Sequence, residues 1–234
     1  MRLVPARERG VEILDDPAVD PAVRERSIAD VTRSNWWLGG LRAARLVAAE
    51  AIREGPRHGM LLDIGTGLAD IPTAVRRDAE RGGVRLSTIG VDRAVSLLAT
   101  ARARGGLNHA VAADALALPF RTGSIDVVTC SQVLHHFEEG DVERLLAEMD
   151  RVARHAAVVS DLRRSWVAVV GFWAVSFILR FHRVTRHDGM VSVMRGFTAN
   201  ELSDLIRRVA GVAPVVSRRL GFRVTARWSP RDTG

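Results

Sequence analysis

The sequence contains no lysine, no tyrosine and only one cysteine, Cys130. Without lysine the chain has no Schiff-base nucleophile, and without tyrosine it has no phenolic general acid. One thiol can form neither a disulfide within the chain nor a cysteine-based zinc site, and we expect no metal ion. A lone thiol also favours a reducing, cytoplasmic compartment. The first ten residues are polar and lack an apolar run, so we expect no secretory signal peptide.

All 34 basic residues are arginine, against 27 acidic residues, which gives a net charge of +7. That balance suits anionic partners such as nucleic acid, a membrane surface or an acidic substrate. Because the arginines are spread along the chain, a solvated basic surface explains them more simply than a nucleic-acid interface does. The length of 234 residues fits one globular domain that buries a sizeable core.

From residue 60 onward, apolar β-branched runs alternate with helical patterns, which predicts an α/β fold with a mainly parallel sheet. Strands are expected at Met60–Ile64, Val84–Val91, Ala110–Ala113, Ile125–Cys130 and Ala156–Ser160. Helices are expected at Ala69–Arg81, Ala94–Arg104 and Asp141–Arg154. Thr198 and Glu201 form a capping-box pattern that opens a further helix. The runs Val212–Ser217 and Phe222–Trp228 are expected to pair as an antiparallel hairpin.

Two segments lie outside this repeat. Helices are expected at Ala22–Arg33 and Leu41–Glu54, with Ser34–Gly40 between them, so residues 1–58 would form an N-terminal helical cap on a domain of residues 59–234. Residues 163–195 form an insertion after the fifth strand. Its apolar run Trp166–Leu179 is short for a membrane span. It fits a buried helix, a lid over an apolar ligand, an interfacial anchor with basic flanks or an oligomer contact.

The central chemical signal is the run LLDIGTGLAD at residues 61–70, where a strand leads into a glycine turn and then a helix. Glycines at such a turn let the backbone approach a ligand closely. A dinucleotide fingerprint would place glycine where Asp70 stands, and a carboxylate there would repel a pyrophosphate. A phosphate-binding P-loop is excluded because no Gly-Lys-Ser/Thr follows. We therefore expect a non-phosphorylated nucleoside with a cationic or zwitterionic tail.

Two further aspartates end predicted strands. Asp92 follows the second strand, where its carboxylate can accept both hydroxyls of a ribose. Asp114 follows the third strand and can accept from an adenine amino group, beside the apolar run that follows it. Strand tips that lie along one edge of a parallel sheet form a crevice there. The simpler role of each aspartate is helix capping or turn formation, and Asp70 is interpreted as a first-turn carboxylate that favours the helix dipole.

The run from Met60 to about Asp161 resembles class I S-adenosylmethionine-dependent methyltransferases, in particular small-molecule enzymes of the ubiquinone and menaquinone biosynthesis type. The resemblance rests on LLDIGTGLADIP, IGVD and ADALALPFRTGSIDVVTCSQVLHHF. It departs at Ala69, where the family often has a third glycine. The resemblance implies a Rossmann-like, seven-stranded and mostly parallel sheet with an antiparallel C-terminal hairpin and helices on both faces.

The resemblance also implies which residues bind S-adenosyl-L-methionine. The glycines of the turn would pass under the methionine moiety, Asp63 would support its amino-acid end, and Asp92 would bind the ribose. Asp114 and Ala115 would frame the adenine, and Ser131 would lie near the methionine tail. In chain order, the cofactor-binding set is Asp63, Gly65, Thr66, Gly67, Asp92, Arg93, Asp114, Ala115 and Ser131.

Methyl transfer from a sulfonium is an in-line displacement, so the protein mainly aligns the acceptor. An oxygen acceptor usually has to lose its proton, and His135 or His136, after the fourth strand, can accept it near neutral pH. The alternative is structural, with one histidine capping the following helix and the other packing. Further residues are expected near the acceptor, with packing of the cap as an equal alternative for the first three. They are Asn35, Trp36, Trp37, Trp166, His187 and Arg195.

These observations favour a methyltransferase acting on a small hydrophobic aromatic or polyketide-like acceptor, with O-methylation preferred. The stretch Ser34–Gly40 resembles methyltransferases of bacterial natural-product pathways. One alternative is C-methylation of a quinone-like lipid by an enzyme in peripheral contact with a membrane. A nucleic-acid methyltransferase fits less well, because Ser131–Leu134 stands where an Asn-Pro-Pro-aromatic motif would be expected. A non-catalytic nucleoside-binding protein is the remaining alternative, and the sequence does not predict an oligomeric state.

Overall fold

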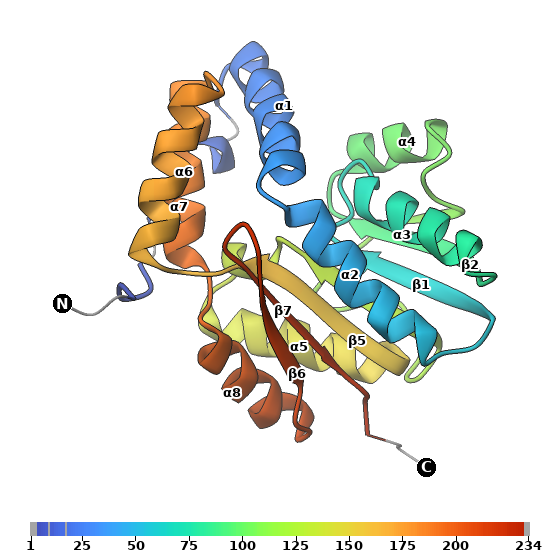
Figure 1. Ribbon diagram of the computed structural model, residues 1–234. Coiled ribbons are helices and arrows are strands. Elements are labelled where there is room, and N and C mark those ends of the chain that lie inside the picture. Colours follow the sequence, from blue (N-terminus) through green and yellow to red (C-terminus); the bar gives the residue numbers. More distant parts are fainter. Residues whose placement is uncertain (1–3, 9, 17, 232–234) are drawn as a thin grey trace.

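The computed structural model describes residues 4–8, 10–16 and 18–231, and a seven-stranded sheet lies at its centre (Figure 1). The strand order is β3-β2-β1-β4-β5-β7-β6. The first five of these pair in parallel, whereas β7 is antiparallel to both β5 and β6. The predicted Rossmann-like sheet with an antiparallel C-terminal hairpin is therefore confirmed. The strands are β1 (His58–Ile64), β2 (Arg85–Asp92), β3 (His109–Ala112), β4 (Ile125–Ser131), β5 (Ala153–Leu162), β6 (Val215–Arg219) and β7 (Arg223–Trp228).

Helices cover both faces of the sheet and one of its edges. They are α1 (Pro21–Trp37), α2 (Gly40–Arg53), α3 (Asp70–Arg81), α4 (Val95–Ala103), α5 (Glu139–Val152), α6 (Trp166–Ile178), α7 (Arg183–Arg195) and α8 (Ala199–Ala210). Two short 3-10 turns, η1 (Ile13–Asp15) and η2 (Leu134–His136), complete the described elements. The predicted capping box opens α8, because the Thr198 side chain accepts from Glu201 N–H and the Glu201 side chain accepts from Thr198 N–H.

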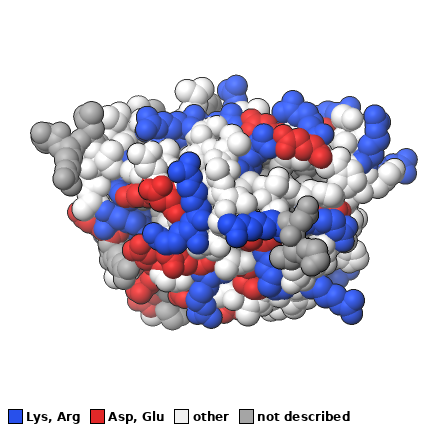
Figure 2. Space-filling view, turned by 90° about the horizontal axis from the view of Figure 1, so that it is seen from below, with Lys and Arg blue, Asp and Glu red and all other residues white. Residues whose placement is uncertain are grey.

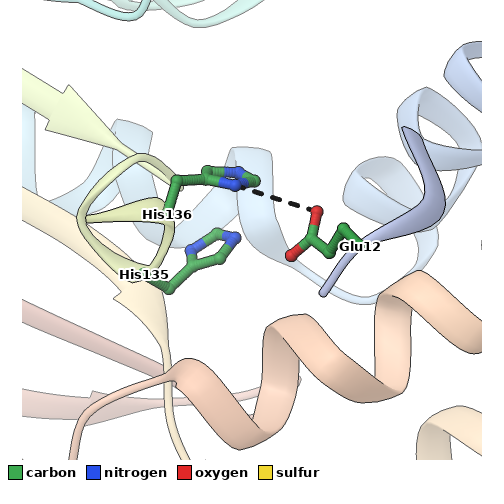
Figure 3. Close-up of side chains that lie close together, drawn as sticks. All are labelled: Glu12, His135 and His136. Carbon is green, nitrogen blue, oxygen red and sulfur yellow. Dashed lines mark ion pairs between the residues drawn. The ribbon is translucent and has the colours of Figure 1, made fainter. Parts of the chain in front are cut away.

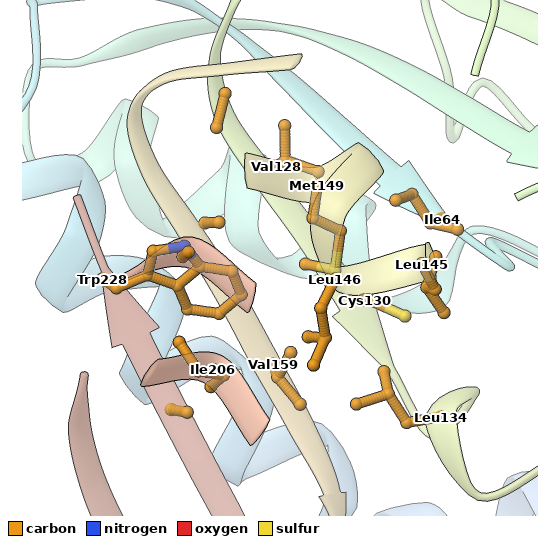
Figure 4. Close-up of a cluster of buried hydrophobic side chains, with 14 of the residues drawn as sticks. Ile64, Val128, Cys130, Leu134, Leu145, Leu146, Met149, Val159, Ile206 and Trp228 are labelled. Atoms are coloured by element: carbon orange, nitrogen blue, oxygen red, sulfur yellow. The ribbon is translucent and has the colours of Figure 1, made fainter. Parts of the chain in front are cut away.

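The larger hydrophobic core lies between the sheet and helices α5 and α8 (Figure 4). One stripe of α5 supplies Val142, Leu145, Leu146 and Met149, all inaccessible or nearly so. On the other face, α2 and α3 pack on β1, β4 and β5 through a second cluster of apolar side chains. Cys130 is buried in the first core, and burial raises its thiol pKa well above the usual value, so this cysteine is a packing residue.

The two segments outside the repeat meet at the carboxyl edge of the parallel strands. Figure 1 shows α1, α6 and α7 standing together beyond the sheet, and α7 contacts α1, α6, η1 and η2. Ser34–Gly40 was expected to separate two helices, and the structure contradicts this expectation. Helix α1 continues through Trp37, and only Leu38 and Gly39 separate it from α2. Helix α2 packs on the sheet and therefore belongs to the core layer. The division of the chain into an N-terminal cap of residues 1–58 and a domain of residues 59–234 stays a prediction.

Other differences from the expected elements are shifts of a few residues at their ends. The largest are at β5, which begins at Ala153 rather than Ala156, and at β6, which begins at Val215 rather than Val212. Before α1, the 3-10 turn η1 ends at Asp15, and the Asp20 side chain caps α1 by accepting from the Ala22 and Val23 N–H groups. None of the helices in the described parts of the chain combines the length and hydrophobicity that a bilayer crossing requires.

Many of the surface arginines are paired with carboxylates. Arg45 contacts Asp78 at 2.7 Å, and Arg208 contacts Glu143 at the same distance. On the face shown in Figure 2, arginines and acidic residues lie interspersed. This arrangement is typical of a solvated surface and provides no support for a nucleic-acid interface.

Candidate active site

The glycine turn after β1 has a left-handed backbone at three positions. Gly65 and Gly67 have φ of +66° and +52°, and Ala69 has φ of +61°. A Cβ on Gly65 would lie 2.4 Å from a methyl carbon of Val133, so only glycine fits there. At Gly67 the direction of a Cβ is open, with no atom within 4 Å. Ala69 is buried and is the N-cap residue of α3, so its methyl group is accommodated in the place where the family often has glycine.

The carboxylate of Asp92 holds this turn against the second strand. One oxygen accepts from the Gly67 N–H at 2.9 Å, and the other accepts from the Ala94 N–H at the start of α4, also at 2.9 Å. Each carboxylate oxygen has a second lone pair that remains available to a ligand hydroxyl. Asp92 therefore joins the turn after β1 to the tip of β2, where a nucleoside sugar would lie.

Asp63, the second-last residue of β1, is buried and lies behind the glycine turn. Its carboxylate accepts from the Thr129 hydroxyl at 2.8 Å. Burial raises the pKa of Asp63 to about 6, the Thr129 hydrogen bond opposes that shift, and the charge of Asp92 adds to it. Asp63 therefore supports the turn from below and does not line the large cavity that opens beside the turn.

Asp114 follows β3 and is half-exposed. It accepts from the Leu116 N–H at 3.0 Å and pairs with Arg93 at 2.7 Å. The backbone hydrogen bond and the Arg93 guanidinium lower the pKa of Asp114, so it is ionised at neutral pH. The predicted residues Asp92, Arg93, Asp114 and Ala115 thus lie together beside the glycine turn, outside the lining of the large cavity.

A cavity of about 970 Å³ opens from the glycine turn toward α1, α6 and α7. Three predicted residues outside the turn, Ser131, Asn35 and Trp36, line it, as do both histidines. Trp37 and Trp166 are 63% and 42% exposed and do not line it. The inner face of α6 contributes apolar residues to the wall, including Ala168, Gly171, Phe172 and Val175.

His135 lies at the floor of this cavity and is held by a buried carboxylate. Its Nδ1 lies 2.6 Å from Asp161, which ends the buried part of β5, and its backbone N–H also faces that carboxylate. Burial raises the pKa of Asp161, but the charge and hydrogen bond of His135 outweigh burial and lower it. An Nδ1–H that donates to Asp161 leaves Nε2 as a proton acceptor.

His136 is oriented differently, although its ring lies 4.2 Å from that of His135. Its Nδ1 lies 3.7 Å from Glu12 (Figure 3). Burial, together with the neighbouring His135, lowers the pKa of His136 well below its usual range. Neither histidine caps α5, because its N-cap is Glu138 and no side chain caps the helix. The capping part of the structural alternative for the histidines is therefore wrong.

Glu12, His135 and His136 bring three potential metal ligands within 4.8 Å of one another. Glu12 is already paired with Arg195 at 3.1 Å and accepts from the Ser192 hydroxyl at 2.7 Å. The predicted residue Arg195 thus acts here by orienting Glu12 at the cavity wall.

His187 lies beside Asp188, at 2.9 Å, and does not line the cavity.

Known proteins share this architecture. A family model described as a methyltransferase domain matches residues 62–160. The chain contains a class I S-adenosylmethionine-dependent methyltransferase domain. This domain is 35% identical over 116 residues to the demethylmenaquinone methyltransferase of Thermus thermophilus, which covers 48% of this chain and 49% of that protein. The same-named protein of Deinococcus radiodurans is 33% identical over 112 residues, covering 46% and 43%. The chain therefore spans about half the length of the curated relatives it matches.

A solved structure is similar to this chain over more than the residues 62–160 that the family model matches. The magnesium protoporphyrin IX methyltransferase of Synechocystis PCC 6803, with bound SAH, superposes with a TM-score of 0.58 over 93% of this chain and 91% of that chain. The sequence identity is 11%, so the likeness establishes the shared fold.

The residues of the methyltransferase domain fit an adenosyl cofactor. The turn offers an open cradle at Gly67, and the carboxylates of Asp92 and Asp114 stand at neighbouring strand tips with lone pairs for hydroxyl and amino donors. When bound, S-adenosylmethionine supplies an activated methyl group on a sulfonium. Ser131 and His135 place polar groups on the side of the cavity beyond the turn.

We predict that Asp92→Ala weakens S-adenosylhomocysteine binding by about 1.5–3 kcal/mol, because it removes a charged acceptor for the ribose hydroxyls. Titration calorimetry measures the change, and a thermal melt checks that the turn stays folded. Asp141→Ala, at a partly exposed aspartate on α5, serves as the control. Equal affinities of Asp92→Ala and the unmodified protein would contradict the assignment.

We predict that Asp63→Asn stabilises the protein above pH 6. The folded-state pKa of about 6 exceeds the unfolded value, so the folded state binds more protons, and stability falls as pH rises from about 4 to about 6. The free energy of unfolding should fall by about 1–3 kcal/mol over this range. The fall should be absent in Asp63→Asn, whose side-chain oxygen can still accept from the Thr129 hydroxyl. Urea unfolding at a series of pH values measures it. Parallel pH profiles for the two proteins would show that Asp63 has no raised pKa.

Proposed function

We propose that the protein transfers the methyl group of S-adenosylmethionine to a small hydrophobic acceptor with an aromatic or polyketide-like body. The observation that carries this proposal is the continuity of the cavity from the glycine turn to a wall of apolar side chains. A nucleoside over the turn would place its tail toward Ser131, and an acceptor beyond it would contact α1 and α6. Pockets of this size and composition typically hold one small ligand with a few polar contacts.

The pair of Asp161 and His135 favours an oxygen acceptor. With Nδ1–H directed at Asp161, the Nε2 atom of His135 can take a phenolic proton as the oxygen attacks the methyl carbon. Asp161 positions the ring and stabilises the imidazolium that forms. His136 has no comparable partner, since Glu12 lies 3.7 Å away and is engaged by Arg195. We therefore assign the role of the base to His135 and a secondary, binding role to His136.

A second candidate is C-methylation of a quinone-like lipid at a membrane surface. Both curated relatives are demethylmenaquinone methyltransferases by name. Helix α6 also presents an exposed apolar stripe on the face opposite the cavity, formed by Trp166, Val167, Val170, Trp173, Phe177 and Ile178. Residues 163–187 contain five arginines and no acidic residue. Exposed tryptophans with basic neighbours suit the interface of an anionic bilayer.

We predict that His135→Gln lowers kcat for a phenolic acceptor by about 10²–10⁴-fold and leaves its KM nearly unchanged, because the proton acceptor is lost. The assay is release of S-adenosylhomocysteine from a panel of phenols and hydroxyquinones, with mass spectrometry of the methylated product. His136→Gln is the matched control, and its kcat should fall less than that of His135→Gln. Equal losses would contradict the assignment, and methylation on carbon alone would favour the second candidate.

We predict that Val170→Glu abolishes binding to phosphatidylglycerol vesicles if the second candidate is correct, because a charge is placed in the centre of the exposed stripe. Val170 is 62% exposed, and Val215 on β6, at 53%, provides the matched control Val215→Glu. Sedimentation with vesicles measures the bound fraction. If the unmodified protein does not sediment with these vesicles, or if both variants behave alike, the membrane candidate is wrong.

A further inference from the structure

Arg223, at the start of β7, is a buried arginine on the wall of the cavity. Its side chain and backbone together are 2% exposed, yet it is among the residues that line the cavity. Nη1 donates to the Gln132 side-chain oxygen at 3.0 Å. Nε is buried and makes no hydrogen bond, and within the described residues no carboxylate lies within ion-pairing distance of the guanidinium. The contacts of Arg223 therefore leave its charge without a paired anion.

Two other arginines of this fold, by contrast, each have a carboxylate partner. Arg164 is buried and paired with Glu201, and it also donates to two backbone carbonyls. Arg195 is paired with Glu12. A buried charge without a partner costs several kcal/mol, so a retained one is expected to meet an anion. Burial lowers the pKa of Arg223 to about 10, the charge of Asp161 opposes that shift, and the guanidinium stays charged at neutral pH.

The polar groups around Arg223 converge on one point of the wall. Three polar atoms surround Gly40: Nη2 of Arg223, the Gln132 amide nitrogen and the Asn35 side-chain oxygen. A Cβ added to Gly40 would lie 3.1 Å from each of the first two and 3.2 Å from the third. Gln132 holds a left-handed backbone, with φ of +58°, and its N–H donates to the Ser160 carbonyl at 2.8 Å. Such strain in a non-glycine residue is typical of a functional site. Phe222 and Phe172 line the cavity nearby, so the polar point has apolar, aromatic surroundings.

We propose that Arg223, together with Gln132, binds an anionic oxygen group of the methyl acceptor, a carboxylate or a phenolate. The proposal rests on the proposed methyl transfer, since it names a group of the molecule that occupies the acceptor end of the cavity. A planar guanidinium binds a carboxylate through two parallel hydrogen bonds, which would orient a rigid aromatic body. The acceptor is thus an aromatic or polyketide-like acid, or an ionised phenol.

The methionine carboxylate of the cofactor is the other possible source of such an anion. The strand order places β4 and β5 between β1, which carries the glycine turn, and β7, which carries Arg223. Three strand spacings amount to about 14 Å. Arg223 also pairs in register with Leu162, at the end of the strand that holds Asp161. Ser131, toward which the methionine tail would extend, ends β4 and lies two strands nearer to the glycine turn than Arg223 does. This position favours the acceptor over the cofactor as the source of the anion.

The test uses two fluorescent probes with the same ring system, anilinonaphthalene sulfonate and phenylnaphthylamine, of which only the first carries an anionic group. The unmodified protein should bind the sulfonate more tightly. Arg223→Gln should lower the affinity for the sulfonate by at least tenfold, the value expected for a lost charged hydrogen bond, and leave the affinity for phenylnaphthylamine unchanged. Arg218→Gln, at an exposed arginine on β6, removes the same net charge and should change neither.

Calorimetry with S-adenosylhomocysteine and with methylthioadenosine, which lacks the carboxylate, separates the two sources. If Arg223→Gln weakens only the binding of S-adenosylhomocysteine and leaves the sulfonate probe unaffected, the anion belongs to the cofactor, and the acceptor assignment is overturned. If neither ligand nor probe responds, the anion site itself is overturned. A protein that binds the sulfonate through Arg223 but binds no S-adenosylhomocysteine would overturn the proposed function and keep the site.

A second measurement needs no variant and holds even if Arg223→Gln fails to fold. Naphthoate should displace the sulfonate probe from the unmodified protein at least tenfold more effectively than naphthylmethanol, its neutral counterpart. Equal displacement by the two would overturn the proposal. The thermal melt is a further check, because removal of an unpaired buried charge should not lower the melting temperature of the unliganded protein.

Discussion

The contact between the Asp92 carboxylate and the Gly67 N–H is the interaction on which the candidate site depends. It fixes the turn after β1 against the tip of β2, and the same carboxylate holds the first turn of α4 through Ala94. On the other side the turn packs against Val133, after β4, and a side chain at Gly65 would collide with it. The turn, the strand tip and the helix start therefore form one rigid edge on which a nucleoside can be held.

The part of the site that would hold the methyl acceptor, here called the acceptor half, is built from different parts of the chain. Asp161 is the second-last residue of β5, β4 leads to Gln132 and His135, and β7 begins with Arg223. Parallel pairing of β4 with β5 and antiparallel pairing of β5 with β7 bring these residues to the same edge of the sheet. Helices α1, α6 and α7 then close the space above them. One edge of one sheet thus holds both the cofactor half and the acceptor half, which suits a direct transfer between two bound molecules.

The fold was largely predictable from the sequence, because alternating apolar runs, the glycine turn and the Thr198–Glu201 pattern are all local signals. The site was less predictable. Asp161 was missed although it ends a predicted strand as Asp92 does, since its partner His135 lies 26 residues earlier and only the β4–β5 pairing joins them. Arg223 was missed because a strand pattern does not show which arginine faces a cavity. Trp37 and Trp166 were expected at the pocket, but neither lines the cavity. The sequence pattern did not show which side of α1 and of α6 would face it.

A crystal structure of the protein with S-adenosylhomocysteine would show whether the nucleoside binds at the turn after β1. We expect the ribose hydroxyls within hydrogen-bonding distance of Asp92, the adenine beside Asp114, and the sulfur facing the cavity between Ser131 and His135. A nucleoside bound elsewhere on the molecule, or no bound nucleoside at saturating concentration, would show that this turn is not the cofactor site.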